Sequence, residues 1–166
     1  MNNNSILRRL RFTFDFNDNK MIDLFQLAGK TVTRAEVSDW LKREDDEAFQ
    51  NLYDHQLSYF LNGLIIQNRG KKEGETPVAE KKLNNNVIFR KLKIALNYRD
   101  EDILNVYELM NFQLSKHELS AFFRKPDHQH FRLCKDQFLR NFLQGLQLKY
   151  ASDRSSKNED FDDADY

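Results

Sequence analysis

The chain of 166 residues contains an internal repeat. Positions of the first half align with positions 82 residues later, and many of the aligned residues are identical or similar. Residues 2–29 match residues 84–111, and the alignment continues without a gap through residues 45–66 and 127–148. Identical or similar residues holding one register over such a length are the signature of a duplicated structural unit. The chain therefore contains two copies of one unit, and each copy constrains the structural prediction for the other.

The first helix of each copy shows how the comparison resolves an ambiguous pattern. The segment RFTFDF (11–16) alternates like a strand, but its counterpart KIALNY (93–98) does not alternate. Two copies of one unit share one secondary structure, so the pattern predicts a helix over about residues 4–15 and again over about residues 86–97.

The last helix of each copy is predicted over about residues 54–67 and 136–149, where leucine and phenylalanine recur with one-face helical spacing. Gly63 and Gly145 lie inside these helices at matching positions. A glycine inside a helix costs about 1 kcal/mol relative to alanine. Its presence in both copies predicts a close contact with a neighbouring helix.

Two further helices lie between the first and the last. The second is expected to begin after Asp18 or Asp100 as the N-cap and to end at Gly29 or Asn111, which tolerate a left-handed conformation. The third begins with TRAE or SKHE, a hydroxyl residue followed three positions later by glutamate, which is the pattern of a capping box. Two helices joined by a short link form the skeleton of a helix-turn-helix unit.

The predicted fold class is all-α, with two tandem homologous four-helix repeats, each containing a helix-turn-helix-like hairpin. With only 5 Gly and 2 Pro, the composition agrees with a helical chain. The predicted organisation is a first repeat (1–69), a polar linker (70–83), a second repeat (84–150) and a disordered acidic tail (151–166). The sequence leaves open whether the repeats pack together and whether the chain forms oligomers.

Charge is distributed unevenly along the chain. The 26 basic and 26 acidic side chains give a formal net charge of zero. The second repeat holds 11 basic and 7 acidic side chains, a net charge of +4, and the tail holds 2 and 6, a net charge of −4. Neutrality is thus a cancellation, and it does not exclude an anionic partner for the second repeat.

A nucleic-acid interface is one hypothesis that the basic residues suggest. Residues four apart share one face of a helix, and a basic face is able to contact phosphates. The candidates on the two third helices, which we call the basic stripe, are Arg34, Ser38, Lys42, Lys116, Ser120 and Arg124. The candidates on the two first helices are Arg8, Arg11, Arg90 and Lys93. The alternative is an ordinary helical hairpin whose charged face is solvated and paired with neighbouring acids.

Candidate metal ligands occur in one copy only. His117, His128, His130 and Cys134 are of zinc-binding types. The matching positions of the first repeat hold Ala35, Asp46, Ala48 and Leu52. The sequence therefore predicts no metal site, and in the absence of any phosphate-binding or nucleophile motif it predicts neither catalytic residues nor a cofactor.

Location is predicted from the cysteine content and the hydropathy. A single cysteine, Cys134, allows no disulfide within the chain. Three arginines interrupt the apolar residues near the N-terminus, which is unlike a signal peptide. No apolar run approaches the roughly 20 residues that a membrane helix needs. A cytoplasmic protein that does not enter the membrane is the expectation.

The repeated blocks also resemble a known family. The pattern I-L-R-x-L-R, D-x-x-x-[MI]-[IL]-x-[LV], V-[TS]-x-x-E-V-x-x-W-L and F-L-x-G-L is similar to that of the YehS-like bacterial proteins, a domain family of unknown function. The second copy departs from it with Asn111 for Gly29 and Phe122 for Trp40. The resemblance covers residues 2 to about 150. It implies a small, cytoplasmic, all-helical bacterial protein with a duplicated domain, and it supplies no activity or catalytic residues.

Taken together, these patterns predict a non-enzymatic helical adaptor or binding protein. Two copies of one module offer two equivalent surfaces, which favours bivalent binding. The partner is a protein or a nucleic acid, with nucleic acid bound through the helix-turn-helix-like units. The alternative is a module that binds proteins only, as a scaffold or regulator, and an enzyme is the weakest of the three hypotheses.

Overall fold

The computed structural model describes residues 1–70 and 77–164, with side chains through Lys157, and in this part of the chain it contains eight helices and no strand. The first repeat forms α1 (Asn3–Phe14), α2 (Asp18–Leu27), α3 (Arg34–Leu41) and α4 (Asp54–Arg69). The second repeat forms α5 (Asn85–Leu96), α6 (Asp100–Leu109), α7 (Lys116–Phe122) and α8 (Asp136–Ala164). The all-helical, duplicated architecture is thus confirmed. Residues 71–76 of the predicted linker lie outside the described residues.

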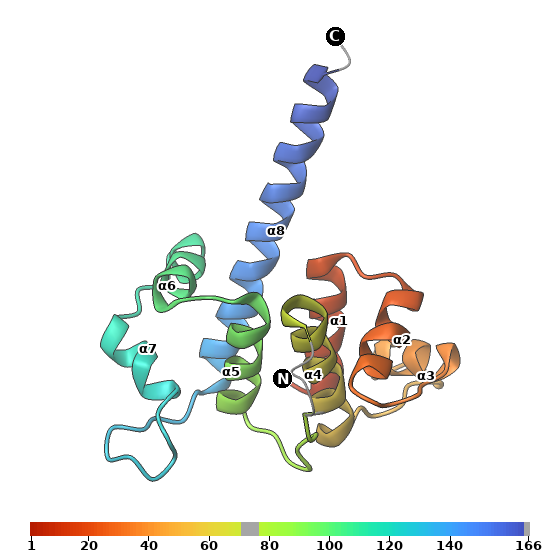
Figure 1. The fold of residues 1–166 in the computed structure, drawn as a ribbon, viewed down its shortest axis with the longest axis horizontal. Helices are drawn as coiled ribbons and strands as arrows, with labels where there is room; N and C mark the ends of the chain where they lie inside the picture. The colour runs from red at the N-terminus through yellow and green to blue at the C-terminus, as the bar shows by residue number, and fades with distance from the viewer. Residues whose placement is uncertain (71–76, 165–166) are drawn as a thin grey trace.

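The two repeats share one body. Helices α1, α4, α5 and α8 occupy the middle of the molecule, with α2 and α3 at one end and α6 and α7 at the other (Figure 1). Helix α4 packs mainly on α2 and on α5, and α8 packs on α6 and on α1. The first helix of each repeat therefore lies against the last helix of the other repeat, which gives the molecule approximate two-fold symmetry.

Two polar contacts between the repeats obey the same symmetry. Arg9 Nη1 donates to Gln144 Oε1 at 2.7 Å. Lys91 Nζ donates to Asn62 Oδ1 at 2.6 Å. The residues of the second contact match those of the first under the offset of 82, so the same interface has been built twice.

The conserved pair of helix glycines marks the closest approach of two helices, as the sequence predicts. A Cβ atom placed on Gly63 would lie 1.7 Å from the carbonyl oxygen of Leu24 in α2. A Cβ atom on Gly145 would lie 2.6 Å from both the carbonyl oxygen and Cγ1 of Val106 in α6. Only glycine allows α4 and α8 to pack this closely on their neighbours.

The second helix of each repeat ends where the sequence predicts, but its N-cap differs from the prediction. Gly29 (φ 91°) and Asn111 (φ 52°) adopt positive φ just after the helices, as expected. The expected N-caps Asp18 and Asp100 are instead the first helical residues, and Asn17 caps α2 by accepting from the amide of Lys20. An acid at the first helical position still stabilises the positive end of the helix dipole.

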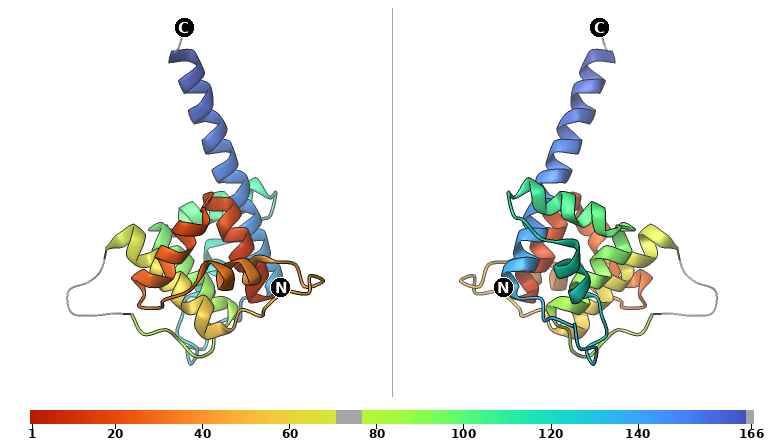
Figure 2. Two further views of the ribbon diagram at one scale, coloured as in Figure 1. Left: turned by 90° about the vertical axis from the view of Figure 1, so that its right-hand side faces the viewer. Right: turned by 90° about the vertical axis from the view of Figure 1, so that its left-hand side faces the viewer.

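The last helix extends beyond the predicted end of the second repeat. Helix α8 continues through Ala164 and projects from the body (Figure 2). Helix α4 ends at Arg69 and is followed by Gly70 with φ 81°, but the matching position in α8 is Ser152, which imposes no such stop. Arg154 Nη1 also donates to the carbonyl of Thr13 at 2.9 Å, which ties this turn of α8 to the end of α1. Residues 165–166 of the predicted tail lie outside the described residues.

The apolar core runs through both repeats. Trp40 is 4% exposed, and its ring centroid lies 5.4 Å from that of Phe25, so Trp40 belongs to the core of the first repeat. Phe60, Leu61 and Leu64 of α4 are buried as well.

Candidate functional site

Each repeat begins with three asparagines whose roles are structural. Asn4 Nδ2 donates to the carbonyls of Trp40 and Gln50 at 2.9 and 2.8 Å, and Asn4 Oδ1 accepts from the amide of Leu52 at 3.0 Å. This side chain is 2% exposed, so these hydrogen bonds form inside the protein. They fasten the long segment between α3 and α4 onto α1.

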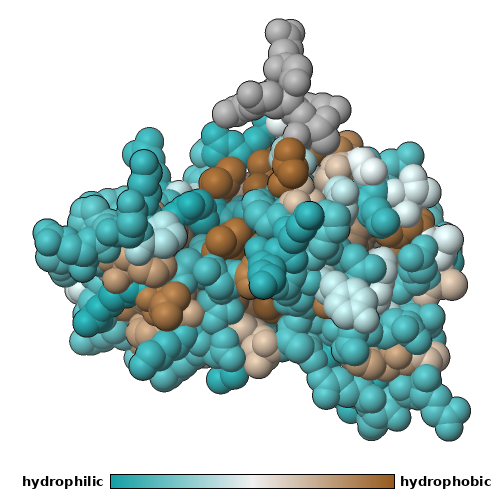
Figure 3. All heavy atoms as spheres, turned by 90° about the horizontal axis from the view of Figure 1, so that it is seen from below, coloured by the Kyte–Doolittle hydropathy of each residue, from teal (hydrophilic) through white to brown (hydrophobic). Residues whose placement is uncertain are grey.

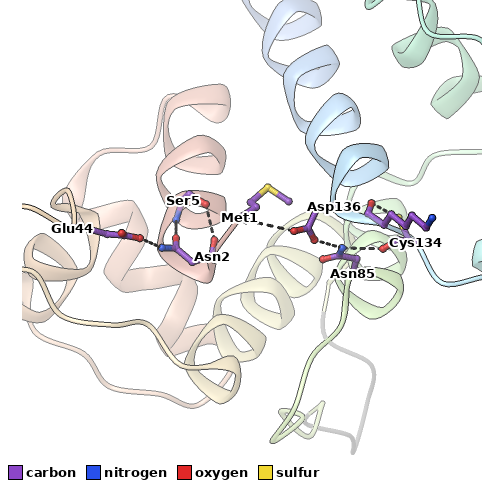
Figure 4. Close-up of polar contacts among 8 residues, drawn as sticks. Met1, Asn2, Ser5, Glu44, Asn85, Cys134 and Asp136 are labelled. Carbon is purple, nitrogen blue, oxygen red and sulfur yellow. Dashed lines mark hydrogen bonds and ion pairs between the residues drawn. The ribbon is translucent and has the colours of Figure 1, made fainter.

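The second repeat contains the same bonds. Asn86 contacts the matching groups of Phe122, Arg132 and Cys134 at 3.0, 2.8 and 2.9 Å. Asn85 Nδ2 donates to the carbonyl of Cys134 at 2.9 Å and to Asp136 Oδ1 at 2.7 Å (Figure 4). The signal in the sequence was an asparagine, Asn4 or Asn86, that is retained in both copies. The asparagine triplets served only to align the copies, and their structural role was not predicted.

The predicted arginines of the first helices cap other helices. Arg8 Nη1 donates to the carbonyl of Lys42 at 2.7 Å, just after α3 ends. Arg90 Nη2 donates to the carbonyl of Phe123 at 3.1 Å, just after α7 ends. A guanidinium at a helix C-terminus satisfies a carbonyl and complements the negative end of the dipole. Both side chains thus have a role in the fold.

The other two candidates on these helices pair with the second helices. Arg11 Nη2 lies 3.7 Å from Asp18 Oδ1, and Lys93 Nζ lies 2.9 Å from Asp100 Oδ1 at the matching place. Lys93 Nζ also lies 4.4 Å from the ring centroid of Phe123, a cation–π contact.

The first residues of the basic stripe are exposed but also paired. Arg34 Nη1 lies 3.6 Å from Asp18 Oδ2, and Arg34 Nη2 donates to Asn19 Oδ1 at 2.6 Å. At the matching place Lys116 Nζ lies 3.1 Å from Glu101 Oε1. Each such ion pair joins the start of the third helix to the second helix and brings an acid into the stripe.

The remaining residues of the stripe are less uniform. Lys42 Nζ donates to Asp39 Oδ1 at 2.8 Å, and this hydrogen bond raises the pKa of Lys42. Ser38 is exposed, whereas the Ser120 hydroxyl donates to the carbonyl of Lys116 at 2.8 Å. Arg124 is half-buried. Because α3 and α7 lie at opposite ends of the molecule, the structure does not bring the two halves of the stripe together (Figure 1).

A groove of about 750 Å³ lies in the second repeat between α7, the segment that follows it and the start of α8. We call it the aromatic groove. Its lining consists of Glu118, Phe122, Phe131, Arg132, Leu133, Lys135 and Phe138. Figure 3 views the molecule from the side of the segment between α7 and α8, and it shows apolar patches among the polar side chains of both repeats.

Aromatic packing fixes the floor of the groove. The ring centroid of Phe138 lies 5.0 Å from that of Phe122 and 5.7 Å from that of Phe112, which approaches edge-on. The hydroxyl of the buried Tyr107 donates to the carbonyl of Phe138 at 2.7 Å. Leu133 is 69% exposed at the rim. The floor is therefore held rigidly while an apolar side chain stays open to solvent.

The first repeat does not share this chemistry. Leu133 corresponds to Asn51, and Phe138 corresponds to Gln56. The edge of the neighbouring depression diverges too, with Phe112 in place of Lys30. The two copies have thus kept a common frame and differ at this surface. The sequence does contain a signal of this difference: at these three positions an apolar residue of the second copy aligns with a polar residue of the first.

The histidines and the cysteine do not assemble into a metal-type cluster. The rings of the exposed His128 and His130 have centroids 5.6 Å apart, and Cys134 is buried. Within residues 1–70 and 77–157, no group of three or more histidine, cysteine or acidic side chains is placed to hold a metal ion. Burial, with a contribution from the Asp136 charge, raises the pKa of the Cys134 thiol to about 12. The thiol therefore stays protonated near neutral pH and is a poor nucleophile.

None of the described helices is both long enough and apolar enough to cross a membrane.

Comparison with known proteins places the chain in a family. It is 42% identical over 147 residues to the uncharacterized protein YehS of Escherichia coli (strain K12), an alignment that covers 88% of this chain and 94% of that relative. No solved structure matches. The model of the family described as "Protein of unknown function (DUF1456)" matches twice, at residues 3–70 and 85–151, in agreement with the duplication and with the resemblance noted in the sequence. The chain belongs to this family, with one family domain in each of its two repeats.

Proposed function

We propose that this protein is a non-enzymatic adaptor that binds a segment of a partner protein in the aromatic groove of the second repeat. The observation that carries the proposal is the divergence of the two copies. The frame of hydrogen bonds around Asn4 and Asn86 is the same in both copies. Two positions of the groove, Leu133 and Phe138, are nevertheless apolar where the first repeat has Asn51 and Gln56. Exposed apolar side chains around a concave surface are typical of protein-binding sites.

The charges beside the groove indicate the chemistry of the partner. Arg132 and Lys135 line the groove together with a single acid, Glu118, and the second repeat has a net charge of +4. A segment that presents apolar side chains together with carboxylates would bury the former on Phe138 and Leu133 and pair the latter with the basic rim. The proposed partner is thus an acidic amphipathic protein segment.

The predicted nucleic-acid interface receives less support from the geometry. Its basic side chains serve as helix caps, as with Arg8 and Arg90, or pair with acids, as with Arg34 and Lys116. A phosphate would have to displace these acids, and the two stripes lie at opposite ends of the molecule. Nucleic-acid binding through these residues stays a prediction, and we favour the protein-binding alternative.

Replacing Leu133 by Asn and Phe138 by Gln should abolish partner binding while leaving the protein folded. Both substitutions copy the residue of the first repeat, whose frame accommodates them. Removing one apolar side chain from the floor of the groove and one from its rim should cost about 2 kcal/mol or more in total, enough to weaken binding by well over tenfold. The measurement is the amount of a stoichiometric partner that copurifies with the full chain after nuclease treatment.

The matched control exchanges a paired residue outside the groove, Arg34→Ser, which should leave copurification unchanged. Retention of the partner by the groove variant would refute the proposed site. Recovery of nucleic acid in place of a protein would refute the proposed class of partner. If purified protein self-associates and the groove variant is monomeric, the occupant is a second copy of this chain and no separate partner.

A further inference from the structure

The two interfaces between the repeats differ at one matching place. In the α4–α5 interface, Glu80 comes from the linker and inserts its carboxylate between the two helices. Lys91 Nζ lies 2.9 Å from Glu80 Oε1, and Ser58 Oγ donates to Glu80 Oε2. The Glu80 amide also donates to Ser58 Oγ at 3.0 Å. This segment is held firmly, since the neighbouring Ala79 is only 8% exposed.

The α1–α8 interface has arginines at the corresponding positions. Lys91 corresponds to Arg9, and Ser58 corresponds to Arg140. Both arginines line an open depression of about 460 Å³ together with Met1, Ser5, Arg8, Phe12 and Gln147. The residues that line this depression include no acid, so none of them takes the place that the Glu80 carboxylate has in the sister interface. Within the described part of the chain, neither Arg9 nor Arg140 forms an ion pair with an acid.

We infer that the depression between α1 and α8 is a binding site for the carboxylate of a glutamate or aspartate in an extended peptide segment of another molecule. The internal ligand of the sister interface indicates what such a site accepts: a segment outside any helix, with a small buried residue followed by an acid. Two guanidinium groups in place of one ammonium and one hydroxyl supply more donors for the incoming carboxylate. This site is distinct from the aromatic groove and does not depend on it.

The charges around the depression agree with this assignment. Burial and the nearby Arg140 lower the pKa of Arg9, which shows that like charges have been placed together. Asp136, one turn before Arg140 on α8, accepts from Asn85 Nδ2 and lies 3.5 Å from the amino group of Met1 (Figure 4). The hydrogen bond from Asn85 is the main cause that lowers the pKa of Asp136, and the charge of Arg140 adds a smaller contribution. Arg8 is held at the end of α3, and Arg9 Nη1 is held by Gln144. An external carboxylate would relieve the repulsion between Arg9 and Arg140.

The test is a titration of the full chain with a blocked peptide that carries the linker sequence PVAE, and with a matched peptide in which glutamine replaces the glutamate. Arginine side-chain NMR signals report binding directly. We expect the glutamate peptide to shift the Nε–Hε signals of Arg9 and Arg140 and the glutamine peptide to shift neither. Arg140→Ser copies the residue of the sister interface, and it should weaken binding by about tenfold or more.

The control Arg43→Ser removes the same charge from an exposed loop and should not change the affinity. An equal response to both peptides, or an affinity that Arg140→Ser leaves intact, would overturn the site. Inorganic phosphate is titrated separately. If phosphate shifts the two arginine signals and the glutamate peptide does not, the site selects another anion and the carboxylate assignment fails.

Discussion

Gly63→Ala should prevent the first repeat from packing and should lower the free energy of unfolding by more than about 3 kcal/mol, since the new methyl group meets backbone that cannot move aside. The added Cβ would lie 1.7 Å from the carbonyl oxygen of Leu24, far inside any real contact. Separating α4 from α2 would also open the core around Phe60 of α4, whose ring centroid lies 5.4 Å from that of Phe25 in α2. Chemical denaturation monitored by circular dichroism gives the free energy directly.

Two other glycines supply the controls. Gly145→Ala meets Val106 at 2.6 Å, partly through a side-chain atom that is able to rotate, so its cost should be smaller than that of Gly63→Ala. Gly29→Ala has no atom within 4 Å of the new Cβ but keeps φ at 91°, so it should cost only about 1 kcal/mol from backbone strain. If Gly63→Ala proves no worse than Gly29→Ala, the close α2–α4 contact does not exist in solution.

Trp40→Ala should cost about 3–5 kcal/mol, the range for removing a large aromatic side chain from a core. Trp40 is 4% exposed and packs against Phe25, whose ring in turn lies 5.4 Å from that of Phe60. The substitution would leave a cavity at the junction of α2, α3 and α4. Thermal and denaturant unfolding of the full chain measure the loss.

The exposed Phe12 is the matched control for Trp40. It is 62% exposed, so Phe12→Ala should change stability by less than about 0.5 kcal/mol. A cost below about 1 kcal/mol for Trp40→Ala would place Trp40 at the surface in solution and would make it a candidate for binding.

The repeat explains why so much of the fold could be predicted from the sequence. The comparison of the copies predicted a helix over residues 4–15 despite the alternation that begins at residue 11, and α1 runs to Phe14. The glycines retained in both copies located the closest helix contacts. Local patterns such as caps and helical periodicity act within a few residues, and the sequence displays them directly. The continuation of α8 past residue 150 was not predicted, because the turn that contains Arg154 makes a contact with a residue far away in the chain, Thr13.

The candidate site was predicted less well because partners decide what a charged side chain does. Arg8 and Arg90 occupy matching positions on the first helix of each repeat, as expected. The carbonyls that they cap belong to residues more than 30 positions away. The asparagine triplets were visible, but the bonds of Asn4 span 36 to 48 residues along the chain. Nothing local in the sequence identifies such partners. The divergence at Leu133 and Phe138 was visible, but its meaning required knowing that both line one groove.

The two repeats share one structural frame and differ locally at the two candidate binding sites. The shared frame consists of the buried asparagines, the helix glycines and the paired contacts between the repeats. The differences are the apolar residues of the aromatic groove and the arginines between α1 and α8. Residues that differ between two copies in one stable frame are not required by that frame, so they are the natural carriers of function.

The most direct test of this account compares two variants of the full chain side by side. One carries Leu133→Asn and Phe138→Gln in the aromatic groove, and the other carries Arg34→Ser and Lys116→Ser in the basic stripe. Each is assayed for the copurifying partner and for binding to a DNA duplex at low salt. The account predicts that only the groove variant loses its protein partner and that the unmodified protein does not bind the duplex. Duplex binding that the stripe variant loses, with partner recovery unaffected by the groove variant, would contradict it.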